Sequence, residues 1–114
     1  MNYVSVLGTI SSDIKVRQLP SGSLICKFSI AHNERYKNQK NELIEKANFF
    51  DVTAFGKQAE VINQYFRKGS RILVQGSLSH DTWTAQDGTK RSKVSIKLDK
   101  FDFIDRKRND EIPF

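Results

Sequence analysis

An all-β domain is predicted for this chain by two features. Apolar residues recur at every second position in several short segments, and glycine, proline and small polar residues separate those segments. Period two with one apolar face is typical of half-buried strands. At 114 residues the chain is long enough for one domain with a single core.

The N-terminal segment is predicted to form one interrupted strand. Residues 3–7 begin it, Gly8 closes its first part, and residues 14–19 continue it. Pro20 and Gly22 then stand where a turn needs them.

A second strand is predicted at residues 24–32, which alternate between an apolar and a polar face. Lys27 lies on the polar face, and the inward set is Cys26, Phe28 and Ile30. Residues 33–46 are polar and charged, so a long hairpin loop is expected there. This loop carries Arg35, Tyr36, Lys37 and Lys40.

A third strand is predicted at residues 47–55 and a short helix at 57–66. The helix has an apolar stripe formed by Ala59, Ile62 and Phe66. Arg67 and Lys68 supply a basic last turn before Gly69, which ends the helix.

Two further strands complete the pattern. Residues 72–78 alternate with Leu78 inward, and Asp87-Gly88 marks a hairpin tip. The last strand runs from Arg91 to about residue 104, and its inward face holds Val94, Ile96 and Leu98. Five strands with one helix between the third and the fourth are the plan of an oligonucleotide-binding (OB) barrel.

The charge balance favours a polyanionic partner. Nineteen Lys and Arg stand against thirteen Asp and Glu, which gives a net charge of +6. The single cysteine excludes an internal disulfide and fits a reducing compartment. Because no apolar run approaches the roughly 20 residues of a membrane span, we expect a cytoplasmic, nucleoid-associated protein with no membrane partner.

The third strand presents two aromatic rings outward. If Phe50, Val52 and Ala54 face the core, Phe49 and Phe55 share the wetter face. Exposed rings need a partner, and unpaired bases are one, since stacking contributes about 1–3 kcal/mol per base. A register shifted by one residue would instead place Phe55 in the core.

Other aromatics lie among cations. Trp83 falls on the outward side of its strand, beside a hairpin that carries Lys90, Arg91 and Lys93. Tyr36 is flanked by Arg35 and Lys37. Rings for bases and cations for phosphates are the requirements of a single-strand groove. Ordinary surface positions or contacts between subunits are the alternatives for Trp83 and Tyr36.

The chain ends in an acidic, apolar segment, Asp110-Glu111-Ile112-Pro113-Phe114. A terminal carboxylate beside an aromatic side chain suits capture in an apolar pocket ringed by cations. The alternative is a frayed, solvated terminus.

Several of these segments together resemble the bacterial single-stranded DNA-binding protein family, over about residues 2–104 and again at the tail. The most specific are Val6-Leu7-Gly8-Thr9-Ile10, Phe55-Gly56-Lys57-Gln58-Ala59, Arg67-Lys68-Gly69-Ser70 and the final five residues. The resemblance implies an OB barrel, a homotetramer, sequence-tolerant binding of single-stranded DNA, and a tip that recruits replication, recombination and repair proteins.

Site residues follow from the resemblance position by position. The stacking aromatics would be Tyr36, Phe49, Phe55 and Trp83, and the cationic contacts would be Arg17, Lys37, Lys57, Arg67 and Lys68. We add Lys27 and the hairpin cations Lys90, Arg91 and Lys93. The chain departs from the family where Tyr36 and Phe49 replace frequent tryptophans and where Asp51 stands at a position where a basic residue can occur.

The predicted domain spans residues 1–105, and residues 106–114 form the tail. Family members usually have a long linker there. Since nine extended residues reach at most about 30 Å, we expect the tip to compete with DNA for the basic groove.

Catalysis and cofactors are not predicted. Neither His32 nor His80 has a second ligand at metal-binding spacing, and Asp51, Asp81 and Asp87 show no nuclease pattern. No phosphate-cradling glycine motif or small-molecule substrate site is evident. An RNA-binding barrel of the same fold and a scaffold with aromatic subunit contacts remain the alternatives.

Overall fold

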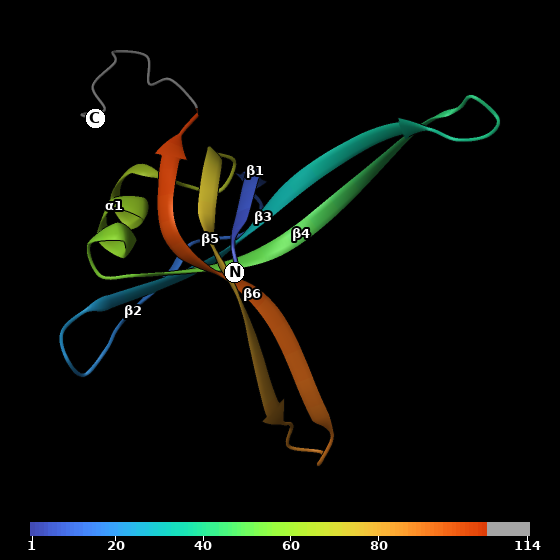
Figure 1. Cartoon of the computed structure of the whole chain (residues 1–114). Coiled ribbons are helices and arrows are strands. Elements are labelled where there is room, and N and C mark those ends of the chain that lie inside the picture. The colour runs from blue at the N-terminus through green and yellow to red at the C-terminus, as the bar shows by residue number, and fades with distance from the viewer. Residues whose placement is uncertain (105–114) are drawn as a thin grey trace.

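The computed structural model describes residues 1–104 (Figure 1). Its elements are β1 (Val4–Ile10), β2 (Lys15–Gln18), β3 (Leu24–Lys37), β4 (Leu43–Phe55), α1 (Lys57–Tyr65), β5 (Arg71–Thr84) and β6 (Lys90–Phe103). None of the helices in the described part of the chain is long and apolar enough to cross a membrane.

The strands close into a barrel because β1 pairs with two partners. It runs antiparallel to β5 along its length and to β3 at Thr9 and Ile10. A parallel pairing of β4 with β6 completes the ring in the order β1-β5-β6-β4-β3. The short strand β2 extends the sheet beyond β3. The predicted OB barrel is thereby confirmed, with α1 between β4 and β5 since β2 is a separate strand.

The barrel interior is filled by aliphatic side chains and capped by the helix. The predicted helical stripe is buried, with Ala59 and Ile62 fully inaccessible and Phe66 6% exposed. Phe66 stacks on Phe103 with ring centroids 4.5 Å apart. The other core residues are Ile10, Ile25, Cys26, Phe28, Ile30, Val52, Ala54, Ile72, Val74, Ile96 and Leu98. Burial raises the pKa of the Cys26 thiol to about 11, so it is a neutral, buried group.

Gly8 does not end the first strand, as the sequence suggested; it lies inside β1. A Cβ atom there would stand 2.9 Å from the carbonyl oxygen of Ala31. The glycine therefore permits the close approach of β1 to β3 that closes the barrel.

Two long hairpins leave the barrel as arms (Figure 1). The predicted loop at 33–46 is wrong, because β3 and β4 remain paired out to Lys37 and Leu43. Only a short turn joins them, in which the side-chain oxygen of Asn38 accepts hydrogen bonds from the backbone N–H groups of Lys40 and Glu42. With both faces of this arm in water, the apolar alternation that marks a strand is missing.

The second arm is the β5–β6 hairpin, whose predicted Asp87-Gly88 turn is confirmed by hydrogen bonds across Ala85 and Thr89. Leu78 and Val94, predicted to face the core, lie on this arm beyond the barrel and are exposed. Phe50, which was also predicted to face the core, is 37% exposed. The predicted basic last turn of the helix is also wrong, since α1 ends at Tyr65 before the cations.

Candidate nucleic-acid interface

One continuous surface crosses the sheet from β2 to β5. Cross-strand partners point to the same side of a sheet. The pairing register therefore aligns one row of side chains across the strands: Lys15, Lys27, Thr53, Lys97 and Ser77. We call this side of β2, β3, β4, β6 and β5 the cross-sheet face. It is the outer side of the barrel, opposite the buried Cys26, Val52 and Ile96.

Both predicted aromatics of β4 lie on the cross-sheet face. Phe49 is 66% exposed and lies opposite the small Ala31, so little covers its ring. Phe55 is 42% exposed, and the Lys97 ammonium lies 5.9 Å from its ring centroid. The predicted strand register is confirmed for this pair. A residue spacing of 3.4 Å sets these two positions about 20 Å apart along the strand.

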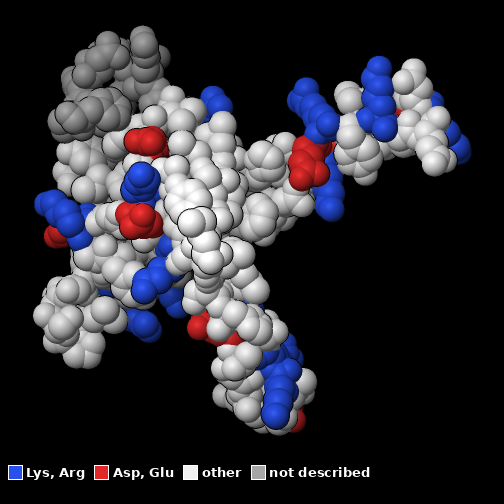
Figure 2. Space-filling model, viewed as in Figure 1, with Lys and Arg blue, Asp and Glu red and all other residues white. Residues whose placement is uncertain are grey.

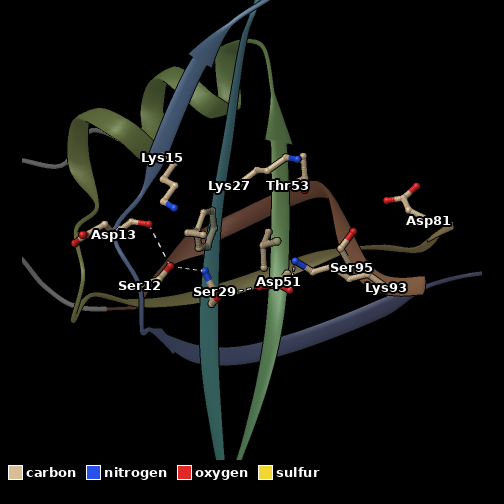
Figure 3. A pocket seen from close by; sticks show the side chains of 12 residues that line it. Ser12, Asp13, Lys15, Lys27, Ser29, Asp51, Thr53, Asp81, Lys93 and Ser95 are labelled. Atoms are coloured by element: carbon tan, nitrogen blue, oxygen red, sulfur yellow. Dashed lines mark hydrogen bonds and ion pairs between the residues drawn. The ribbon is translucent and has the colours of Figure 1, made fainter. Parts of the chain in front are cut away.

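Between the two rings the face is hollowed into a groove of about 330 Å³ (Figure 3). Its floor includes the buried Phe28 and Val52, and Lys15, Lys27 and Lys93 reach it from three strands. The remaining lining residues are Ser12, Asp13, Ser29, Asp51, Thr53, Asp81 and Ser95.

Asp51 is held at the centre of this groove by two donors. The Ser29 hydroxyl donates to its Oδ1 at 2.7 Å, and Lys93 Nζ lies 2.8 Å from its Oδ2. Desolvation opposes ionisation of this carboxyl, but the hydrogen bonds from Lys93 and Ser29 and the charge of Lys93 outweigh it. The pKa of Asp51 consequently lies below its usual value, and the group is ionised at neutral pH.

Trp83 forms a second aromatic position, on the β5–β6 arm. It is 46% exposed and lies directly opposite Arg91. A hollow of about 480 Å³ is lined by Thr82, Trp83, Thr84, Lys90, Arg91 and Ser92. Trp83 and Arg91 thus lie side by side on one face of the arm, as a base with its phosphate requires, while the adjacent Lys90 points to the other face.

Arg17 and Lys27 lie together at the β2 end of the cross-sheet face. They line a hollow of about 240 Å³ with Lys15, Val16 and Ile25. Lys15 and Lys97 were not among the predicted contacts. Lys15 lies two residues before the outward Arg17, and Lys97 lies two residues after the outward Ser95. Because side chains alternate along a strand, this spacing could have identified both lysines as outward residues.

Tyr36 is the aromatic that the structure separates from the others. It pairs with Ile44, whereas Phe49 pairs with Ala31, and the alternation along β3 and β4 puts the two rings on opposite sides of the arm. Lys37 pairs with Leu43 and shares the side of Phe49. Tyr36 is half exposed there.

The remaining predicted cations lie outside the groove. Lys57 begins α1 just after Phe55, and its Nζ is 4.0 Å from Glu60. Arg67 and Lys68 are exposed in the turn after α1, which is tied to β1 by a 2.8 Å hydrogen bond from Gly69 to Ile10. Lys57, Arg67 and Lys68 are not among the residues that line the three hollows described above.

Basic side chains lie on both arms and on the barrel itself (Figure 2). Figure 2 shows lysine and arginine side chains gathered on both long hairpins, with fewer acidic groups among them. Two of the acidic groups are paired, since Arg35 meets Glu45 at 3.0 Å and Arg91 meets Asp87 at 3.8 Å. Within residues 1–104 no group of three or more His, Cys, Asp or Glu side chains converges to hold a metal ion.

The sequence of the barrel matches a known family over its full length. Residues 1–104 match the model of the single-strand binding protein family. The chain belongs to that family. This family member is 42% identical over 114 residues to the single-stranded DNA-binding protein of Helicobacter hepaticus, covering 99% of this chain and 67% of the relative.

Other relatives agree. The single-stranded DNA-binding protein of Wolinella succinogenes is 42% identical, and the match covers 93% of this chain and 65% of the relative. The single-stranded DNA-binding protein of Aquifex aeolicus is 40% identical, and the match covers 98% of this chain and 76% of the relative. The family member described here thus spans about two thirds of the first two relatives.

Solved structures share the fold. The structure of Plasmodium falciparum SSB in complex with ssDNA superposes with a TM-score of 0.85 at 27% identity, covering 92% of this chain and 96% of that one. A deletion mutant of the Thermus aquaticus single-stranded DNA binding protein gives 0.79 at 27% identity, covering 92% and 51%.

The predicted partner-binding residues, Asp110, Glu111, Ile112, Pro113 and Phe114, lie outside the described residues, as does the predicted boundary at residue 105.

Proposed function

We propose that this protein binds single-stranded DNA on the cross-sheet face and the two arms, without catalysis and with little dependence on sequence. The observation that carries the proposal is the placement of Phe49, Phe55 and Trp83, which are exposed rings among cations on one side of the sheet. Every base has a face that can stack on such a ring.

Phosphates are bound by the cations between the rings. Lys15, Lys27 and Lys97 form a row across the face, Lys93 and Arg91 continue it on the same side of the β5–β6 arm, and Lys90 adds a cation on the other side of that arm. Each neutralised phosphate releases counterions, so affinity falls as salt rises. Arg17, Lys37, Lys57, Arg67 and Lys68 extend this basic path around the barrel and the first arm.

Tyr36 contacts the DNA if the DNA strand wraps round the β3–β4 arm. Its ring is on the side opposite Phe49, so one short segment of DNA reaches only one of the two. A longer strand wraps the arm and stacks on both.

Assembly into a homotetramer is also proposed. In the described chain β1 pairs with β3 only at Thr9 and Ile10, and the Leu7 carbonyl is hydrogen-bonded to His32, which leaves the edge of Val4 to Val6 open for pairing with another copy. Tyr3 and Leu7 are 56% and 40% exposed beside that edge. Analytical ultracentrifugation with and without oligo-dT tests this proposal, and a monomer under both conditions would contradict it.

The acidic tip is proposed to recruit replication, recombination and repair proteins and to compete with DNA for the groove. A chain ending at Asn109 loses two acidic side chains and the phenylalanine. We expect it to bind oligo-dT more tightly than the full chain at low salt, with the difference vanishing at high salt. Equal low-salt affinities would refute the competition.

The binding proposal is tested by competition between oligo-dT, an RNA of matched sequence and a duplex of matched length. Preferred binding of oligo-dT supports it. Stronger binding of the RNA would favour the alternative of an RNA-binding barrel, and no measurable binding of any of the three would favour a protein scaffold.

A further inference from the structure

An ionised carboxylate is unfavourable at the centre of a face that binds a polyanion. Asp51 stands in the middle of the cross-sheet groove, between Lys15 and Lys27 on one side and Lys93 on the other (Figure 3). A phosphate placed against it would be repelled. A hydrogen-bond donor of the DNA would instead be attracted to this side chain.

The carboxylate is fixed and keeps free acceptor sites. Ser29 holds Oδ1 and Lys93 holds Oδ2, so both oxygens have defined positions. An ionised carboxylate offers about four lone-pair sites, of which these contacts use two. Both oxygens thus remain able to accept a further hydrogen bond from the groove, where the side chain is 40% exposed.

A stacked base would bring its edge to this place. Phe49 is the preceding outward residue of β4, about 7 Å away at two residues of strand rise. The Phe49 ring is exposed to solvent because its cross-strand neighbour, Ala31, is too small to cover it. A base lying on Phe49 and directed along β4 therefore presents its hydrogen-bonding edge to Asp51.

We propose that Asp51 reads the donor edge of the base stacked on Phe49 and gives this face a preference for guanine. In an unpaired guanine, N1–H and the N2 amino group point the same way and match the two carboxylate oxygens. Cytosine offers one amino donor, and the single N–H of thymine is flanked by carbonyl oxygens that the carboxylate repels. This inference rests on the proposed binding of single strands and names the base that one position of that site prefers.

The test compares guanine with hypoxanthine, which lacks only the N2 amino group. Two oligonucleotides carry isolated deoxyguanosines or deoxyinosines at the same positions in a thymidine chain, spaced to prevent quadruplexes. We expect the full chain to bind the guanine form about fivefold more tightly, the lower end for a bidentate base contact, because the groove is open to water. Asp51→Asn should abolish this ratio.

Asp81→Asn is the matched control. Asp81 lines the same groove at the end away from Ser12, and its substitution removes the same charge (Figure 3). Both variants should bind plain oligo-dT more tightly, while Asp81→Asn keeps the guanine preference. Equal affinities of wild type for the two oligonucleotides, or a ratio that persists in Asp51→Asn, would overturn the inference. Failure to bind plain oligo-dT would instead overturn the proposed function.

Discussion

Trp83 and Arg91 are cross-strand partners that lie side by side on one face of the β5–β6 arm, and both line one hollow. Neither residue belongs to the barrel core, and the core residues of β6 that lie nearest to this arm are Ile96 and Leu98. The arm therefore combines a stacking surface with a cation at a distance from the residues that stabilise the fold. Substitutions there separate binding from stability.

The opposite placement of Phe49 and Tyr36 predicts a dependence on DNA length. Phe49→Ala should weaken the binding of both an oligonucleotide of about 8 nucleotides and one of about 35, by about 1–3 kcal/mol, since one barrel holds about 4–16 nucleotides. Tyr36→Ala should weaken only the longer one. Fluorescence anisotropy measures both affinities. Equal losses for the two variants on the short strand would contradict the wrapped path round the arm.

Lys27 should contribute one phosphate contact. It lies in the row between Lys15 and Thr53 on the cross-sheet face. Lys27→Ala should reduce the slope of log affinity against log salt by about 0.7, the value for one phosphate of a single strand. Lys100→Ala is the control, because Lys100 pairs with Gln75 and lines none of the three hollows described above. A salt series for the three proteins that gives one common slope would exclude Lys27 from the interface.

Removing Lys93 should raise the pKa of Asp51. The native carboxyl ionises below its usual pH, so its contribution to stability is present above about pH 4, the unfolded value. That contribution is lost as the pH falls through the lower folded pKa. Lys93→Met should therefore lose less stability between neutral pH and about pH 3 than the wild type.

Lys93→Arg, which keeps the charge, serves as the control for that experiment. NMR titration of the Asp51 carboxyl carbon reads the pKa directly, and denaturant unfolding at the two pH values reads the stability. An Asp51 that titrates at the same pH with and without the Lys93 charge would show that the pair has no energetic effect in solution.

The elements with one face in the core were predictable from sequence. Ala59, Ile62 and Phe66 form a buried stripe as their spacing predicted, and Phe49 and Phe55 face outward as the β4 alternation predicted. In these segments burial itself produces the pattern.

The arms were not predictable in the same way. From Asn33 to Lys46 both faces of the hairpin are in contact with water, so apolar and polar residues do not alternate there. The sequence therefore did not indicate on which side of the hairpin Tyr36 lies. The Asp51–Lys93 pair depends on the parallel contact of β4 with β6. That contact arises only when the barrel closes, which no local pattern in the sequence reports.

The central claim is that exposed rings of this face stack on the bases of a single strand. Trp83 is the only tryptophan of the chain, so its fluorescence reports one position. Titration with oligo-dT should quench this fluorescence to saturation, with a midpoint that moves to higher DNA concentration as salt increases. If anisotropy shows the oligonucleotide fully bound while the Trp83 emission is unchanged, base stacking on this arm is contradicted.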